Sequence, residues 1–172
     1  VVGAPYTDIG AYHSGAAYVF VRSGTTWSEQ QVLAPADPQM YNSFGQSVSV
    51  SGDTAVAGAW LHDLPGSALG GAAYVFVRSG STWSEQHKLV ASDPAPGAYF
   101  GRSVSGSGDL AVVGADAFSA TDGGAGYVFV RLGNTWTFSR KLLTPAPAAY
   151  DRVGFSTSVS GVLISAVWDI PS

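Results

Sequence analysis

The chain contains no cysteine, which excludes a disulfide framework and any chemistry that depends on a thiolate. Only 12% of its residues are charged, and lysine occurs only at Lys88 and Lys141. Because the net charge is −4 and no run of basic residues is present, nucleic acid is not expected as a partner. The sequence also lacks any run of about 18 apolar residues, so no membrane insertion is expected.

Hydrophobic residues and glycine are abundant instead. Hydrophobic residues make up 46% of the chain, there are 22 glycines, and the mean hydropathy is +0.17. A chain of this composition can bury a core, which argues against disorder. Glycine, valine and aromatic residues together favour many short strands that are buried against one another.

One segment recurs along the chain. The ten residues GAAYVFVRSG occupy positions 15–24 and return unchanged at 71–80, and a looser version, GYVFVRLGNTW, lies at 126–136. A tryptophan marks the same place in each unit, at Trp27, Trp83 and Trp136. A period of roughly 50 residues is typical of solenoids, propellers and arrays.

Each unit contains four strand-like segments, which we label A to D. In one unit A is 44–51 and B is 54–59; C is exemplified by 16–22 and D by 26–33. Segment C is apolar on both faces and must therefore be covered on both faces, and no segment has helical spacing. A β-helix would have shorter coils, and a sandwich would not repeat its sequence. The pattern predicts an all-β fold made of β-propeller blades, each with four antiparallel strands.

The junctions between units carry a family resemblance. Phe44-Gly45 with Gly58-Ala59, and Phe100-Gly101 with Gly114-Ala115, resemble the FG-GAP repeat, and Val2-Gly3-Ala4-Pro5 supplies the full Gly-Ala-Pro ending. In the third unit the pattern drifts, because Val153-Gly154-Phe155 replaces the Phe-Gly pair and Val162 stands where the other units have aspartate. The resemblance covers nearly the whole chain and is strongest to the bacterial form of the repeat.

The FG-GAP resemblance implies an architecture and a role. The family builds the propeller heads of integrin α-chains and of many bacterial surface proteins, so the chain would be part of a propeller of about seven blades. About three and a quarter repeats are present, with approximate boundaries 1–54, 55–110, 111–163 and an incomplete 164–172. The resemblance also implies an extracellular or cell-surface location, although no signal peptide opens the sequence, and a non-enzymatic role in recognition or adhesion.

Neither a metal site nor a catalytic site is expected. Calcium, the best-known ligand of the family, takes six to eight oxygen ligands, whereas the A–B loops hold one aspartate each, Asp53 and Asp109. These aspartates are better explained as turn residues. Gly154-Phe155-Ser156 looks like part of a nucleophile elbow but lacks its second glycine. Gly106-Ser107-Gly108 looks like a dinucleotide-binding loop, but it lies between two predicted strands and is therefore a tight turn. The sequence therefore predicts no cofactor and no enzyme.

One face of the predicted propeller is diversified. The A–B and C–D turns are short and nearly identical, whereas the B–C and D–A loops are long and differ between units, and recognition is commonly placed on such loops. Aromatic and acidic side chains suit a protein or glycan ligand. The predicted ligand-binding residues are Tyr6, Asp8, Tyr12, His13, Trp60, His62, Asp63, Asp116, Phe118 and Asp122.

Alternatives remain for this face. A sugar-binding propeller would repeat small pockets at every blade junction, and an enzyme scaffold would need carboxylates that converge in the central channel. Tyr41, Tyr99 and Tyr150, which precede the Phe-Gly region, belong either to the recognition surface or to the packing of the blade junctions. The histidines are interpreted as surface residues.

The ends of the chain predict association. The sequence begins and ends inside a repeat, with segments B-C-D, two complete units and a final A-B, or thirteen strands. Three blades are too few to close a ring, and open ends expose strand edges. The chain is therefore expected to be a piece of a longer protein, or to pack against further blades or other subunits, and not to form a stable monomer.

Overall fold

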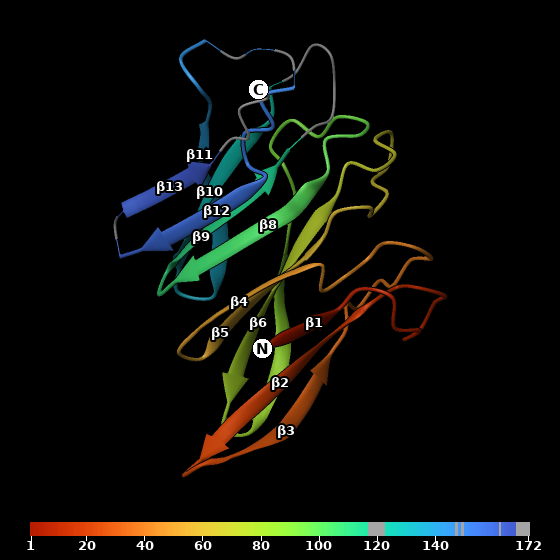
Figure 1. Ribbon diagram of the computed structural model, residues 1–172, viewed down its shortest axis with the longest axis vertical. Coiled ribbons are helices and arrows are strands. Elements are labelled where there is room, and N and C mark those ends of the chain that lie inside the picture. The colour runs from red at the N-terminus through yellow and green to blue at the C-terminus, as the bar shows by residue number, and fades with distance from the viewer. Residues whose placement is uncertain (117–122, 147, 149, 162, 168–172) are drawn as a thin grey trace.

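The computed structural model describes residues 1–116, 123–146, 148, 150–161 and 163–167, and this part of the chain forms thirteen strands in four antiparallel sheets (Figure 1). The first sheet contains β1 (Val2–Ala4), β2 (Ala16–Ser23) and β3 (Thr26–Leu33). The second contains β4 (Ser47–Ser51), β5 (Thr54–Ala59), β6 (Ala72–Ser79) and β7 (Thr82–Leu89). The third contains β8 (Phe100–Ser107), β9 (Leu110–Ala115), β10 (Ala125–Leu132) and β11 (Thr135–Leu142). The fourth contains β12 (Ser156–Ser160) and β13 (Leu163–Val167).

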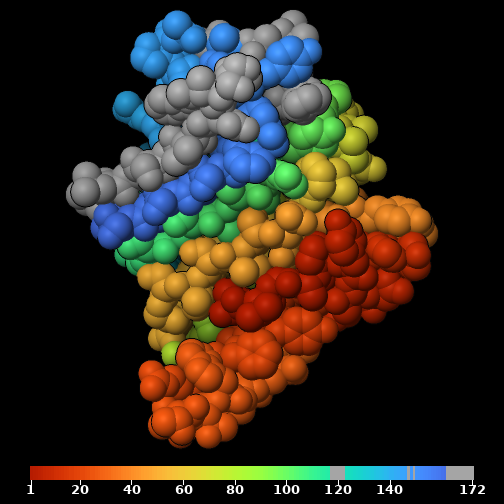
Figure 2. Space-filling view, in the orientation of Figure 1, coloured from red at the N-terminus to blue at the C-terminus, as the bar shows by residue number. Residues whose placement is uncertain are grey.

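The sheets are propeller-like blades, and the strand order A-B-C-D predicted from the sequence is confirmed. The first sheet supplies B-C-D, the next two supply A-B-C-D, and the last supplies A-B. The blades are stacked in chain order, so in Figure 2 the colours follow one another in bands across the molecule. Within the described residues, the structure contains no helix long and apolar enough to cross a membrane.

The connections between strands fall on two sides of the stack. The short A–B and C–D turns lie at the left and lower side of Figure 1, and the long B–C and D–A loops lie at its right and top. This separation follows from antiparallel pairing, because alternate connections leave a sheet at opposite ends. We call the side with the long loops the loop face.

Serines on the A strands connect successive blades. The Ser47 hydroxyl donates to the Gly101 carbonyl at 2.8 Å, and the Ser103 hydroxyl repeats this contact with the Gly154 carbonyl at 2.8 Å. Two residues further along from Ser47, the Ser49 hydroxyl accepts a hydrogen bond from the Gly106 N–H of β8, which is the next A strand. Because side chains alternate across a strand, the Ser-x-Ser-x-Ser pattern directs one polar row toward the following blade.

The repeated tryptophans connect the outer strands. Trp83 Nε1 donates to Gln30 Oε1 of the preceding blade at 2.9 Å, and Trp136 Nε1 donates to Gln86 Oε1 at 3.0 Å. Trp83 and Trp136 are 5% and 3% exposed, whereas Trp27 of the first sheet is 64% exposed. The duplicated Trp-Ser-Glu-Gln segment therefore packs one blade against the next.

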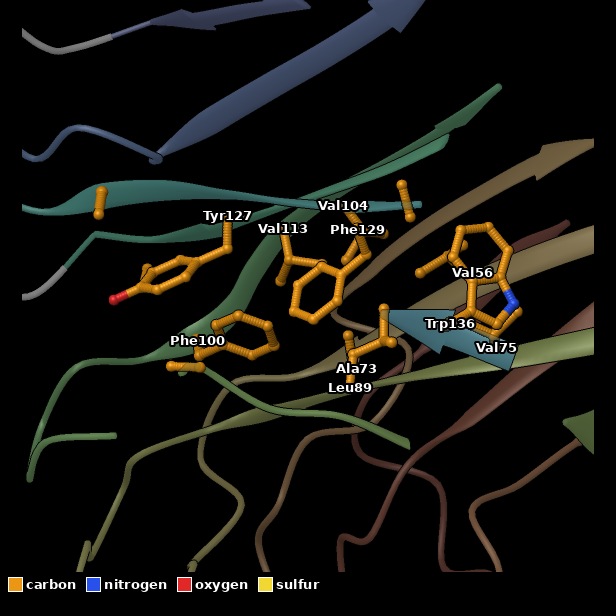
Figure 3. Packing of buried hydrophobic residues seen from close by; sticks show 14 residues of the cluster. Val56, Ala73, Val75, Leu89, Phe100, Val104, Val113, Tyr127, Phe129 and Trp136 are labelled. Carbon is orange, nitrogen blue, oxygen red and sulfur yellow. The ribbon is translucent and has the colours of Figure 1, made fainter. Parts of the chain in front are cut away.

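Aromatic residues from the Phe-Gly pairs fill the space between blades. Phe100 is fully buried and meets Tyr127 and Phe129 edge-on, with ring centroids 5.3 and 6.0 Å away (Figure 3). Phe44 has the same relation to Tyr74 and Phe76, at 5.6 and 5.9 Å. Valines and alanines of the facing sheets complete each core. The apolar character of the C strands on both faces is thus explained by a blade on each side.

The two glycine motifs of the family meet at each blade junction. A Cβ added to Gly58 would lie less than 3.0 Å from the carbonyl oxygen of Gly101, and a Cβ added to Gly114 would overlap in the same way with the Gly154 carbonyl. The glycine of Gly-Ala in one blade thus packs directly on the glycine of Phe-Gly in the next blade. At the fourth sheet Val153 replaces phenylalanine and is still buried, so the drift in this unit preserves the junction.

Candidate functional site

Four aromatic side chains gather on the loop face. Tyr6, Tyr12 and His13 lie in the B–C loop of the first blade, and Tyr41 lies in the D–A loop that follows. The His13 ring is 4.0 Å from Tyr12 and 5.7 Å from Tyr41, measured between centroids, and Tyr12 meets Tyr41 edge-on at 5.4 Å. The tyrosines at positions 6, 12 and 41 are 69%, 50% and 54% exposed. We call these four residues the aromatic cluster.

The backbone fixes the aromatic cluster in place. His13 and Tyr41 have φ angles of 50° and 62°, in the left-handed region that non-glycine residues rarely adopt. The Asp8 carboxylate accepts a hydrogen bond from the His13 N–H at 2.7 Å, and the Tyr41 N–H donates to the Tyr12 carbonyl at 3.0 Å. Strained backbone of this kind persists where surrounding contacts hold it and is common at functional sites. The Asp8 carboxylate, predicted to bind ligand, braces its own loop.

The second B–C loop is braced in the same way. Asp63 accepts a hydrogen bond from the Leu69 N–H at 2.7 Å, and Leu69 has a φ of 54°. Asp63 is also linked to the D–A loop through the Gln39 side chain, which accepts from the Asp63 N–H at 2.9 Å. Asp63 is exposed, as expected, and its carboxylate has a structural role in the loop.

His62 is buried, so its interpretation as a surface histidine is wrong. Its exposed fraction is 1%. Its Nε2 lies 2.7 Å from Lys88 Nζ and 3.6 Å from an Asp37 carboxylate oxygen, and its Nδ1 lies 3.4 Å from the Tyr74 hydroxyl. The loop folds inward here because the polar ends of Tyr74 and Lys88 offer partners at the edge of the core. Polar groups buried at such a depth need partners of this kind.

The charged groups around His62 shift each other's pKa. Burial, and then the positive charge of Lys88, lower the pKa of His62 to about 4. For Asp37, burial acts to raise the pKa, but hydrogen bonds from Lys88 and Tyr74 outweigh it and the pKa is lowered. Burial and the hydrogen bond to Asp37 raise the pKa of Tyr74. At neutral pH the site therefore combines a neutral histidine with a Lys88–Asp37 ion pair.

The Asp–Tyr–Lys part of this network is repeated in the third blade. Asp93 accepts from the Tyr127 hydroxyl at 2.9 Å and from Lys141 Nζ at 2.7 Å. The sequence contains a signal for this arrangement, because Lys88 and Lys141 occupy equivalent places in their units and so do Asp37 and Asp93. Because the network recurs with the blades, its role is to connect the D–A loop to the blade that follows.

Trp60 and Asp116 each lie near Arg102, in a second group at the junction of the later blades. Asp116 is 2% exposed, and its Oδ2 accepts from Arg152 at 2.7 Å. The Trp60 ring packs on the Arg102 guanidinium, which is 4.5 Å from the ring centroid. Asp116 is therefore a buried ion-pair member and not a freely exposed loop carboxylate. Phe118 and Asp122 lie outside the described residues.

The three tyrosines that precede the A strands differ in their surroundings. Tyr99 packs edge-on against Trp60, with centroids 5.1 Å apart, as the junction-packing alternative expects. Tyr41 and Tyr150 are 54% and 45% exposed. Of the three, Tyr41 belongs to the aromatic cluster.

The A–B turns use their aspartates for ion pairs. Arg78 Nε donates to Asp53 at 2.7 Å, and Arg131 Nε donates to Asp109 at 2.8 Å. Each guanidinium also lies over the tryptophan of its own blade. No group of three or more His, Cys, Asp or Glu side chains that could hold a metal ion occurs among the described residues.

We expect the stability of the chain to be independent of calcium. Each turn carboxylate is paired with an arginine and has too few oxygen neighbours for a calcium site. Thermal unfolding followed by circular dichroism should give the same midpoint in EDTA and in millimolar calcium. A midpoint that rises by several degrees with calcium would show that a calcium site exists.

Family comparison agrees with the junction geometry. The model of the FG-GAP repeat matches residues 27–76 and 83–129, and the chain belongs to the FG-GAP repeat family. FG-GAP propellers are typical adhesion and recognition modules, are generally non-catalytic and are often found in extracellular proteins. A search of curated proteins gives no match.

Proposed function

We propose that the chain is a non-enzymatic recognition or adhesion module of an extracellular or cell-surface protein, and that it binds a protein or glycan through the loop face. The aromatic cluster is the observation that carries this proposal. The three tyrosines of the cluster are each at least half exposed, and all three rings lie next to the His13 ring. Rigid aromatic anchors bind ligands at a low entropic cost.

The contrast between the two faces supports the choice of the loop face. On the opposite side, where the short turns lie, Asp53 forms an ion pair with Arg78 and Asp109 forms one with Arg131. On the loop face, the second blade has Leu69 in the place of His13 and Gly97 in the place of Tyr41, with the same positive φ angles. The aromatic cluster is therefore not repeated in the second blade, whereas Tyr150 keeps the place of Tyr41 in the following D–A loop, with a φ of 65°.

The difference between the first two blades bears on the alternatives. A lectin with one pocket at each blade junction would repeat its aromatic residues, and the second blade does not repeat them. Asp37 and Asp93 form ion pairs with lysines that recur with the blades. We therefore favour one ligand-binding centre over a multivalent lectin and over an enzyme scaffold.

Packing against further blades or other subunits remains a prediction. On β12, Ser156, Ser158 and Ser160 occupy the places of the serines that bind the following blade at the earlier junctions, and all three are exposed. The A strand of a further blade would bind to this row of serines, as β8 and β12 bind to the serines of the A strands before them.

The double variant Tyr12→Ser/Tyr41→Asn tests the proposed function. Asparagine is chosen at position 41 because it tolerates positive φ. The labelled chain should be screened on a glycan array and against a displayed random-peptide library, and affinities for the strongest ligands measured by fluorescence anisotropy. We expect the variant to bind them roughly tenfold or more weakly, since exposed aromatic anchors dominate such interfaces.

The matched control is Trp27→Ser/Leu132→Ser, which removes two large apolar side chains that are 64% and 72% exposed next to the C–D turns. It should bind as the unchanged chain does. If the control weakens binding as much as the loop-face variant, or if the loop-face variant binds normally, the ligand does not bind at the aromatic cluster.

A further inference from the structure

Arg102 occupies an unusual position at the loop-face end of β8. It directly follows the Phe100-Gly101 pair, and its guanidinium lies between two aromatic rings. The guanidinium carbon is 4.5 Å from the centroid of Trp60 and 5.6 Å from that of Phe155. The side chain is 24% exposed. Contacts with two rings restrict the guanidinium, and part of the side chain still reaches solvent.

The hydrogen bonds of Arg102 set it apart from the other partly buried arginines. Arg78, Arg131 and Arg152 each donate to a carboxylate at 2.7 or 2.8 Å. Arg102 Nε lies 3.8 Å from Asp116 Oδ2, which is too long for a hydrogen bond. Among the residues that the structure describes, the Arg102 guanidinium makes no side-chain hydrogen bond. A guanidinium has five N–H donors, and a partly buried one needs acceptors for them.

Arg102 lies near a carboxylate that another arginine already binds. Asp116 Oδ2 accepts a hydrogen bond from Arg152 at 2.7 Å and lies 3.8 Å from Arg102 Nε. Two further polar atoms, Trp60 Nε1 and Asp116 Oδ1, are buried and have no hydrogen-bond partner.

We propose that Arg102 binds the carboxylate of an acidic side chain in a polypeptide partner. This inference rests on the proposed function, namely that the loop face binds a ligand. A guanidinium presents parallel N–H donors in one plane, which match the two oxygens of a carboxylate. Asp116 lies close by and would repel a doubly charged phosphate more strongly than a singly charged carboxylate.

The rim of the site is apolar, which favours a polypeptide over a small acidic solute. Phe155 is 41% exposed and Trp60 is partly exposed. An arginine surrounded by a tryptophan and a phenylalanine has the composition of the centre of a protein interface, where apolar contacts exclude water around a charged pair. Water exclusion is what makes the guanidinium–carboxylate pair strong.

The test uses fluorescent decaglutamate as the probe and decaglutamine as its uncharged counterpart, with binding measured by anisotropy at low ionic strength. The unchanged chain should prefer decaglutamate, and Arg102→Gln should weaken decaglutamate binding at least tenfold. Arg102→Lys should recover only part of this loss, because lysine keeps the charge but not the planar pair of donors. The matched control is Arg140→Gln, which removes the same charge from an exposed residue of β11.

Several outcomes would overturn the proposal. These are equal binding of the two peptides by the unchanged chain, equal loss in Arg140→Gln and Arg102→Gln, or full recovery in Arg102→Lys. Tighter Arg102-dependent binding of a sulfated heparin hexasaccharide would replace the carboxylate with a sulfate ligand and the polypeptide with a glycan. Thermal midpoints of all variants should agree within a few degrees, which separates lost binding from lost folding.

The two proposals can fail separately. If Arg102→Gln leaves decaglutamate binding unchanged while Tyr12→Ser/Tyr41→Asn still loses its array ligand, the loop face binds a ligand without Arg102. If neither variant changes any binding, the proposed function itself is wrong.

Discussion

Replacing Gly58 with alanine will destabilise the fold by about 3 kcal/mol. The added Cβ would lie less than 3.0 Å from the carbonyl oxygen of Gly101 and also from the Ser47 hydroxyl. Neither neighbour can move alone, because Ser47 donates to that same carbonyl and Gly101 belongs to β8. Relief therefore requires two blades to separate, and urea unfolding followed by tryptophan fluorescence will measure the loss.

Gly106→Ala is the matched control for this substitution. Gly106 also lies within a strand, but the nearest atom to an added Cβ is a Val56 methyl carbon at 3.5 Å, an ordinary contact. The stability should change by no more than about 1 kcal/mol, since alanine also restricts the unfolded chain. Equal destabilisation by the two substitutions would mean that the glycine contact between blades is not what orders the junction.

Acidification from pH 7 to pH 4 will remove up to about 3 kcal/mol of stability through His62 alone. The pKa of His62 falls from 6.5 to about 4 in the folded chain, so the unfolded chain takes up the proton first. The stabilising contribution is therefore complete above pH 6.5, declines as the pH falls below that value, and levels off below about pH 4. The imidazolium would lie beside Lys88, which opposes protonation in the folded state.

The difference in pH slope between the unchanged chain and His62→Gln isolates this effect from carboxylate titration. Unfolding free energies measured from pH 7 to pH 4.5 should decline less steeply in His62→Gln. The control is His87→Gln, which replaces a partly exposed histidine of β7. A slope that is the same in all three proteins would contradict the burial of a neutral histidine at position 62.

The strands could be predicted from the sequence because each blade is written as a repeat. Strand C is apolar on both faces only because a blade lies on each side, and the Phe-Gly and Gly-Ala pairs mark the two halves of one contact. Such signals are periodic, so one copy confirms the next. The thirteen strands and their division among four sheets follow from this regularity.

The loops could not be predicted in the same detail, because their residues do not repeat. A histidine followed by an aspartate looks the same in sequence whether it faces solvent or, as His62 does, the hydroxyl of Tyr74. Asp8 has an exposed loop position in sequence, but only the turn of the chain brings the His13 N–H to it. Arg102 lies in a strand, and its significance depends on rings from two other blades.

Hydrogen exchange of the whole chain, with and without its strongest ligand from the glycan array or peptide library, tests recognition through the loop face most directly. The account predicts that ligand slows amide exchange in the loops around Tyr12 and Tyr41, and around Trp60, while exchange in the A–B and C–D turns is unchanged. Protection confined to the turns, or spread evenly over all blades, would contradict binding at the loop face.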